Sequence, residues 1–381
     1  DWSSDVCSSD LGGQPAEGGF TVAQIAHQVW AEGTKKLAIV SDDPDKYPAN
    51  YFPSGATIHH RRELDAVQRT LREIEGLTVL IYDQTCAAEK RRRRKRGLFP
   101  DPAKRVFINE RVCEGCGDCS VASNCVSVQP LETELGRKRR IDQSNCNKDF
   151  SCIEGFCPSF VMVQDPKLRK ADRTAADPKA LFADLPTPPA AALSAPYNIL
   201  ITGIGGTGVI TIGALLGMAA HVQGLACSTL DFTGLSQKNG AVMSHVRLAP
   251  ASDMLTTVRI APGNANLILG CDLVVATSVP ALSRAERGFT RAVVNADLLP
   301  TASFVIDPDI DFEASSMRDA LNGAVRPDDL DILDATGLAT ALMGDSIATN
   351  AFMLGFAFQR GAIPLSLEAI LKAIELNGAA I

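Results

Sequence analysis

"YNILITGIGGTGVITIGALLGMAAHVQG", residues 197–224, decides the fold of the second half of the chain. It begins with an apolar run of strand length and continues, after a glycine turn, with apolar residues at helical spacing. The turn has the pattern G-x-G-G-x-G and is made by Gly203, Gly205, Gly206 and Gly208. This order is typical of a site for NAD or FAD, in which the helix N-terminus faces phosphate. The same glycines would also allow a tight turn and close helix–strand packing, with the helix N-terminus facing an anionic group or a partner domain. The residues alone leave both interpretations open.

The rest of this region continues the alternation of strands and helices. The segments expected to be strands are "LACSTLD", "GAVMSHVRL", "ANLILGCDLVVATS", "RAVVNAD" and "LDILDAT", and "SIATNAFMLGFAFQRG" and "SLEAILKAIELNG" are expected to be helices. Near the start, the strand candidates "KKLAIVSDD" and "LTVLIYDQT" alternate with helical patterns over residues 21–33 and 63–76. The predicted fold class is therefore multidomain α/β.

Shifts in composition divide the chain into six segments. The first ten residues, with Cys7, resemble translated adapter sequence and are left out of the functional argument. The chain lacks a start methionine and ends on "IELNGAAI", so we expect a fragment of a longer protein. The predicted segments are an adapter-like stretch (1–10), an α/β domain (11–88), a basic linker (89–107), a cysteine-rich module (108–165), a Pro/Ala-rich linker (166–197) and a second α/β domain (198–381).

Composition and charge exclude several classes of protein. The 381 residues are 46% hydrophobic and carry a net charge of −7, which argues against a general nucleic-acid binder. No apolar run reaches the length of a membrane span and no signal peptide is evident, so a cytoplasmic protein is expected. The basic run "EKRRRRKRG", residues 89–97, is interpreted as a solvated linker. A nucleic-acid patch and a docking patch for an acidic partner are the alternatives.

Seven of the eleven cysteines fall in one short segment. The spacing C-x2-C-x2-C-x5-C, followed by C-x5-C-x4-C-P, resembles a two-cluster ferredoxin, in which the last cysteine of each run binds the other cluster. This exchange rule assigns one [4Fe–4S] cluster to Cys113, Cys116, Cys119 and Cys157, and a second cluster to Cys125, Cys146, Cys152 and Asp149. A zinc site and unligated structural cysteines are the alternatives. The isolated Cys86, Cys227 and Cys271 are expected to be inert.

Asp149 stands where a ferredoxin would have a cysteine, with two residues between it and each neighbouring cysteine. A carboxylate is a harder and more labile iron ligand than a thiolate, so the second cluster is expected to convert between four-iron and three-iron forms. The simpler alternative is an aspartate that caps or solvates a polar loop. His245, in a polar segment that also contains Gln237, Lys238, Asn239, Ser244 and Arg247, is expected to be structural.

Three segments resemble one enzyme family. The cysteine segment is similar to that of the long, fused bacterial indolepyruvate ferredoxin oxidoreductases, and "ITGIGGTGVITIGALLG" with "DFTGLSQKNGAVMSHVR" resembles the gamma-type domain of the 2-oxoacid:ferredoxin oxidoreductases. The N-terminal part of the chain resembles the end of the family's thiamine diphosphate-binding domain, in the segments "GGQPAEGGFTV", "SDDPDKYP" and "YDQTCAAEKRRRRKRG". The resemblance covers about residues 11–381 in matching order. It implies a partial thiamine-enzyme-like domain, a ferredoxin-like iron–sulfur domain and a Rossmann-like gamma-type domain.

The resemblance also implies an activity. Such enzymes oxidatively decarboxylate an aryl 2-oxoacid such as indolepyruvate with thiamine diphosphate and Mg²⁺, transfer the acyl group to CoA and pass electrons through iron–sulfur clusters to ferredoxin. The expected partners are ferredoxin, the remaining parts of the enzyme and a second copy of the chain. No G-D-G motif for thiamine diphosphate is present, and this puts that cofactor site in doubt and predicts no turnover by this chain alone. A stand-alone electron-transfer module and an NAD- or FAD-linked oxidoreductase are the competing hypotheses.

Overall fold

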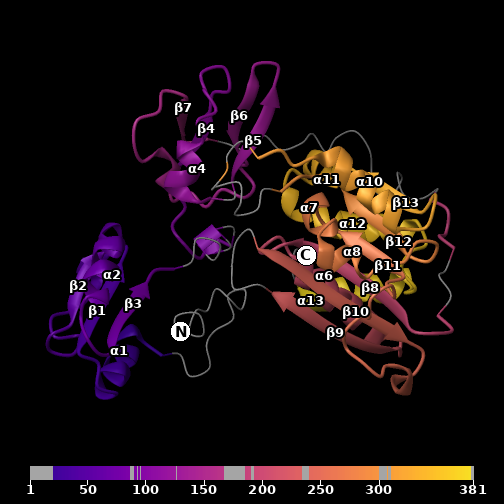
Figure 1. Ribbon diagram of the computed structural model, residues 1–381, viewed down its shortest axis with the longest axis horizontal. Helices are drawn as coiled ribbons and strands as arrows, with labels where there is room; N and C mark the ends of the chain where they lie inside the picture. The colour runs from indigo at the N-terminus through magenta and orange to yellow at the C-terminus, as the bar shows by residue number, and fades with distance from the viewer. Residues whose placement is uncertain are drawn as a thin grey trace. The chain divides into compact units, whose positions relative to one another are not determined.

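The computed structural model describes residues 20–85, 90–91, 93–94, 96–125, 127–166, 185–189, 193–233, 240–299, 307 and 310–378. The chain divides into two compact units, residues 1–101 and 102–381 (Figure 1). The adapter-like segment, Cys86, most of the Pro/Ala-rich linker and the stretch from Gln237 to Asn239 lie outside the described residues. No described helix is both long enough and apolar enough to cross a membrane.

The first unit is a three-stranded parallel sheet with β1 at its centre. Successive residues of β1 point to opposite faces, so Leu37 and Ile39 pack against α1 while Ala38 and Val40 pack against α2. Both predicted strands and both predicted helices are present. The elements are α1 (Val22–Ala31), β1 (Lys36–Ser41), η1 (Pro44–Lys46), β2 (Thr57–His60), η2 (Arg61–Glu63), α2 (Leu64–Arg72) and β3 (Thr78–Asp83).

The cysteine-rich module consists of short elements held at both ends by one pair of strands. Strand β4 pairs antiparallel with β7, so that Lys104 lies opposite Gln164 and Ile108 opposite Phe160. All seven cysteines of the segment lie between these two strands in the chain. The elements are β4 (Lys104–Ile108), α4 (Asp118–Ser123), the hairpin of β5 (Val128–Thr133) and β6 (Gly136–Ile141), η3 (Ser151–Ile153) and β7 (Phe160–Gln164).

The C-terminal domain is built on a six-stranded mixed sheet of order β13-β12-β11-β8-β10-β9. Strands β8, β11, β12 and β13 are parallel, whereas β10 runs antiparallel to both of its neighbours. The strands are β8 (Tyr197–Ile204), β9 (Ala226–Thr233), β10 (Ala241–Ala249), β11 (Leu267–Gly270), β12 (Arg291–Asn295) and β13 (Leu330–Leu333).

Helices cover both faces of this sheet (Figure 1). Ile199 and Ile201 of β8 pack into a core with α6, α12 and α13, while Leu200 packs into a second core on the opposite face with α7 and α10. A central strand that is apolar on both faces explains the continuous apolar run in the sequence. The helical elements are α6 (Val209–Val222), η5 (Ser252–Met254), α7 (Leu273–Ala276), α8 (Val279–Leu282), α10 (Ala314–Ala324), α11 (Ala335–Met343), η6 (Ser346–Ala348), α12 (Thr349–Gln359) and α13 (Leu367–Asn377).

One strand prediction was wrong in its extent. The segment "ANLILGCDLVVATS" was expected to be a single strand, but β11 ends at Gly270 and a short helix follows. Asp272 begins this helix, because its side chain accepts a hydrogen bond from the backbone N–H of Val275 at 2.7 Å. An aspartate at this position satisfies a backbone donor that an extended chain would leave exposed. The apolar residues after Asp272 therefore pack as a helix.

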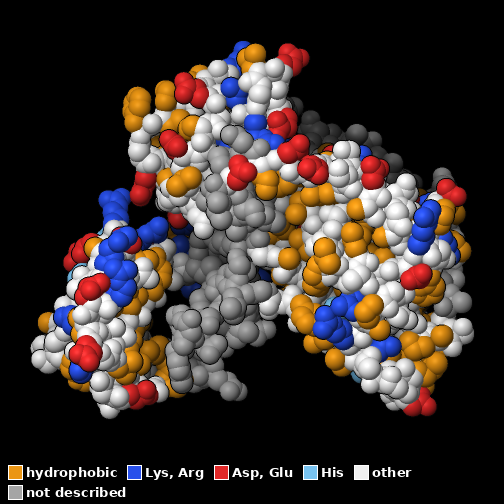
Figure 2. All heavy atoms as spheres, in the orientation of Figure 1, with side chains coloured by type: hydrophobic (Ala, Val, Ile, Leu, Met, Phe, Trp, Pro, Cys, Tyr) orange, Lys and Arg blue, Asp and Glu red, His pale blue; other side chains and the backbone are white. Residues whose placement is uncertain are grey.

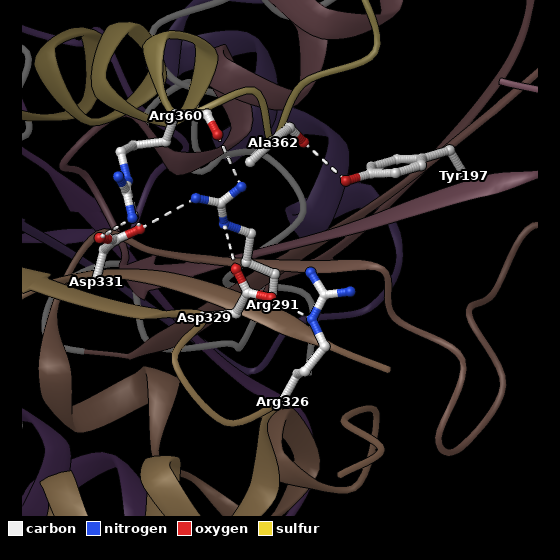
Figure 3. Close-up of polar contacts among 7 residues, drawn as sticks. All are labelled: Tyr197, Arg291, Arg326, Asp329, Asp331, Arg360 and Ala362. Atoms are coloured by element: carbon white, nitrogen blue, oxygen red, sulfur yellow. Dashed lines mark hydrogen bonds and ion pairs between the residues drawn. The ribbon is translucent and has the colours of Figure 1, made fainter. Parts of the chain in front are cut away.

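A network of charged residues joins β12 and β13 to the end of α12 (Figure 3). Arg291 donates to the Arg360 carbonyl at 2.8 Å and forms an ion pair with Asp331 at 3.4 Å. Arg360 contacts the same carboxylate at 3.1 Å. Because Arg291 and Asp331 are mostly shielded from water, with 14% and 18% of their side chains exposed, this pair is screened less than a surface pair.

Replacing Asp331 with Asn is predicted to destabilise the C-terminal domain by about 1–3 kcal/mol, because Arg291 and Arg360 would share a shielded site without that charge. Urea unfolding at pH 7 measures the change. Asp319→Asn, on the exposed side of α10, is the control and should change stability by less than about 0.5 kcal/mol. Equal effects of the two substitutions would contradict the role of the network.

Candidate functional site

The first three cysteines of the module lie on one glycine-containing turn. Gly115 and Gly117 have φ angles of 84° and 85°, in the left-handed region that favours glycine. A Cβ atom at Gly115 would stand 2.3 Å from the Arg137 carbonyl oxygen, so the turn packs directly on the backbone of β6. The loop is therefore fixed in shape by its glycines.

The thiols on this turn are close enough to influence one another. Burial raises the pKa of Cys119 to about 11, and the guanidinium of Arg139 opposes this rise. The thiols of Cys113 and Cys116 raise the same pKa further. Arg139 is only 1% exposed, so it is a positive charge buried beside this group of three cysteines. We call Cys113, Cys116 and Cys119 the first cysteine group.

Cys125, Cys146 and Cys152 form a second cysteine group, which lines one pocket together with Asp149. Burial raises the pKa of Cys152 to about 12, and its next largest causes are the thiols of Cys125 and Cys146. The pKa of Cys146 is raised as well, mainly by burial. The remaining lining residues are Val106, Ser123, Ser127, Val128, Ile141, Asn147, Lys148 and Phe150.

Asp149 is exposed, lines this pocket and takes part in a local turn. Its Oδ1 accepts hydrogen bonds from the backbone N–H of Ser151 at 3.2 Å and from the Ser151 hydroxyl at 2.8 Å. Such a bond to the residue two positions ahead is the usual turn-forming use of aspartate. The capping role considered from the sequence is therefore present, and it leaves the ligand role of Asp149 a prediction.

Cys157 is the residue that the exchange rule added to the first cysteine group. It is exposed, and its Sγ lies 3.0 Å from the Ser159 hydroxyl. Its assignment as the fourth ligand of the first cluster stays a prediction.

The donor set fits an iron–sulfur cluster better than a single ion. Within the described part of the chain, no three Cys, His, Asp or Glu side chains converge closely enough to hold one metal ion. In a cluster each thiolate binds a different iron, so the ligands lie farther apart than around one zinc ion. Two groups of three thiols are compatible with that wider spacing, and in the second group Cys125 follows α4 whereas Cys146 and Cys152 follow β6.

The glycine loop after β8 is explained largely by packing. A Cβ atom at Gly203 would stand 2.6 Å from Cγ2 of Val209 and 2.9 Å from the Cβ of Cys271. The N–H of Gly205 donates to the Gly240 carbonyl at 2.8 Å, so it is already engaged within the chain. Gly208 has a φ of 102° and begins α6. Ligand binding by Gly203, Gly205, Gly206 and Gly208 stays a prediction, and close packing is the better supported of their two interpretations.

Asp231 does not lie where a ribose-binding acid would be expected. Such an acid stands at the end of the parallel strand beside the glycine turn. Here Asp231 belongs to β9, and β10 lies between β9 and β8. The spacing along the sequence was close to the dinucleotide pattern, but the antiparallel β10 takes the neighbouring place in the sheet.

Asp272 is a buried acid that the sequence analysis did not single out. It follows β11 at the carboxyl edge of the sheet, beside the glycine loop, where ligands bind in open α/β sheets. Burial raises its pKa to about 7, backbone N–H groups oppose the rise and Asp297 adds to it. An aspartate directly after a buried strand was the available signal. Its side chain caps α7 and is 0% exposed, so its observed role is structural.

His245 is a buried structural histidine, as expected. Its Nδ1 accepts a hydrogen bond from the Ile260 N–H at 3.1 Å, and its ring packs edge-on against Phe232. Burial lowers the pKa of His245 to about 4, and the nearby Arg284 and Arg259 lower it further. The imidazole is therefore neutral at pH 7.

Comparison with known proteins identifies relatives of the C-terminal domain. Residues 198–380 match the family model "Pyruvate ferredoxin/flavodoxin oxidoreductase". "Indolepyruvate oxidoreductase subunit IorB" of Pyrococcus horikoshii is 29% identical over 48% of this chain and 86% of the relative, and that of Thermococcus kodakarensis is 28% identical over the same shares. The crystal structure of pyruvate oxidoreductase subunit PORC from Thermotoga maritima is 17% identical, covers 48% of this chain and 86% of that one, and has a TM-score of 0.34. These matches confirm the family resemblance for the C-terminal domain, to which residues 198–380 belong.

Gly203→Ala is predicted to destabilise the C-terminal domain by about 1–3 kcal/mol, because an added methyl group would overlap Val209 and Cys271. Thermal unfolding measures the loss. Gly323→Ala in α10 is the control: no atom lies within 4 Å of its added Cβ, so alanine should stabilise this helix by up to about 1 kcal/mol. Destabilisation by both substitutions would show that crowding at Gly203 is not the cause.

The contribution of His245 to the stability of the C-terminal domain is predicted to fall as the pH drops from 7 to 5, while the raised pKa of Asp272 acts in the opposite direction in both proteins compared. His245 has a lowered pKa in the folded state, so only the unfolded chain takes up its proton in this range. The loss attributable to His245 should be on the order of 2 kcal/mol at pH 5. Urea midpoints at the two pH values, compared between wild type and His245→Asn, measure it. The same pH dependence in both proteins would refute the assignment.

Proposed function

The chain carries a domain of the 2-oxoacid:ferredoxin oxidoreductase family, and from this we propose that the chain forms part of an enzyme that oxidatively decarboxylates an aryl 2-oxoacid such as indolepyruvate. In this proposal the cysteine-rich module relays electrons toward ferredoxin, and CoA receives the acyl group. The curated relatives are named as subunits of indolepyruvate oxidoreductases, which supports both the substrate class and the presence of partner subunits. The complete reaction would require the rest of the enzyme.

The observation that carries the proposal is the pair of cysteine groups in the same chain as this domain. A bound iron–sulfur cluster would supply one-electron transfer, which ferredoxin as an acceptor requires. The chain contributes thiols that are shielded from water and, beside the first cysteine group, the buried cation Arg139. A positive charge at this position favours the thiolate form that binds iron. The thiols themselves would hold the clusters.

The residues of this chain do not provide a thiamine diphosphate site. The sequence contains no G-D-G motif, so no step of the proposal is assigned to that cofactor here. The NAD- or FAD-linked alternative loses support, because the Gly205 N–H is engaged by the Gly240 carbonyl and Asp231 lies beyond β10. Membership of the C-terminal domain in the oxidoreductase family supports the proposed function, and the electron-transfer role of the cysteine module is the part that remains to be tested.

Anaerobic iron and sulfide analysis with EPR tests this role. Two clusters predict about six to eight irons per chain, with a three-iron signal wherever the Asp149-held iron is lost. Asp149→Cys should convert that signal into a four-iron one, because a thiolate holds the labile iron more tightly than a carboxylate does.

Two variants serve as references for the iron analysis. Cys152→Ser should remove about half of the iron, since it deletes a thiol of the second cysteine group. Cys227→Ser, a half-buried thiol of the C-terminal domain, should leave the iron content unchanged. If the wild-type protein contains about four irons and Asp149→Cys changes no spectrum, the chain holds one cluster. If the protein contains no iron after anaerobic reconstitution, the proposed electron-transfer role is refuted.

A further inference from the structure

The basic run before the cysteine-rich module is a folded surface of the first unit. Residues 90–96 are seven consecutive lysines and arginines in a chain whose net charge is −7. Of these, the structure describes residues 90–91, 93–94 and 96, which include a helical turn. Lysine and arginine side chains gather on the unit that contains α2 (Figure 2). The described residues of the run therefore include a helical turn that the sequence alone did not indicate.

The end of this helical turn is closed by a specific hydrogen-bond pattern. The N–H of Gly97 donates to the Arg94 carbonyl at 3.0 Å, and the N–H of Leu98 donates to the Arg93 carbonyl at 2.8 Å. Gly97 has a φ of 69°. These two bonds and a left-handed glycine make up the Schellman motif that ends many helices. The motif fixes where the basic turn stops and where the chain leaves it.

One side of the turn is fastened to the rest of the unit. Lys90 forms an ion pair with Asp42 at 2.8 Å, in which only 14% and 29% of the two side chains are exposed. The cations of Lys90 and Arg94 lie 5.9 Å and 5.3 Å from the centre of the Phe99 ring, and Arg94 also donates to the Pro100 carbonyl at 2.9 Å. These contacts hold the turn at both ends.

The other side of the turn presents charge to solvent. Arg93 and Arg96 are both exposed. A fixed cluster of like charges at a surface attracts partners of opposite charge and raises their association rate, and salt weakens this effect. Arg93 and Arg96 are the exposed arginines among the described residues of the turn, so they are accessible to a partner.

We propose that the surface formed by Arg93 and Arg96 docks an acidic one-electron carrier protein. This inference rests on the proposed function, because it needs the cysteine module to deliver electrons. Complexes between redox partners are small, transient and steered by charge, which a compact basic turn suits. The turn directly precedes the cysteine segment in the chain, which favours a redox partner of that segment over nucleic acid as the occupant.

Binding of an acidic bacterial ferredoxin to the full chain tests the proposal. The dissociation constant is measured at about 50 mM and about 300 mM salt for wild type, for Arg93→Glu/Arg96→Glu and for Arg69→Glu/Arg72→Glu. The second pair lies on α2 in the same unit, is 67% and 70% exposed and undergoes the same change of charge. Wild type should bind at least about tenfold more weakly at the higher salt concentration.

The first variant should weaken binding at low salt by about tenfold or more and lose most of the salt dependence, whereas the second should change it by less than about threefold. Equal weakening in both variants, or none in either, would overturn the proposal. So would stronger binding of a single-stranded RNA oligonucleotide than of ferredoxin to the same residues. Iron content and EPR of Arg93→Glu/Arg96→Glu should equal those of wild type, so a lost docking site and an absent cluster give different results.

Discussion

The close approach of α6 to β8 at Gly203 is the constraint on which the C-terminal domain depends. No side chain fits there, since Val209 and Cys271 already occupy the space that a Cβ atom would take. This contact sets the helix low on the sheet, so that Leu216 is buried against Ile199 and Ile201 in the larger core. Gly203 is thus required for the close packing of α6 on β8, and the loop that follows it is held by the hydrogen bond from the Gly205 N–H to the Gly240 carbonyl.

The cysteine-rich module differs from the C-terminal domain in what determines its shape, because few buried apolar side chains hold the module together. Positive φ angles at Gly115 and Gly117 shape one loop, and a local turn at Asp149 and Ser151 shapes the other. In each cysteine group, burial raises the pKa of at least one thiol. Thiols with a raised pKa stay protonated in the free protein, so a metal that bound them would have to displace their protons.

Much of the architecture could be predicted from the sequence, and the failures have physical causes. Strands β1, β8 and β12 and helices α1, α6 and α13 follow from apolar periodicity, because each buries a continuous face. The end of β11 could not be predicted, since a helix cap at Asp272 interrupts an unbroken apolar run. Among the site residues, the two groups of three cysteines were anticipated by spacing. The position of Asp231 could not be predicted, because it depends on the order of strands in the sheet. The contact of the basic turn with Phe99 could not be predicted either, because residue spacing does not encode contacts between side chains.

The pairing of β4 with β7 has a consequence for how such a chain can evolve. Because Lys104 lies opposite Gln164, the polypeptide enters and leaves the cysteine-rich module at the same place. A segment whose two ends meet can be inserted into, or removed from, a longer protein without changing the path of the chain on either side. The module is in this sense a cassette, which one gene can carry within a fused chain and another can encode separately.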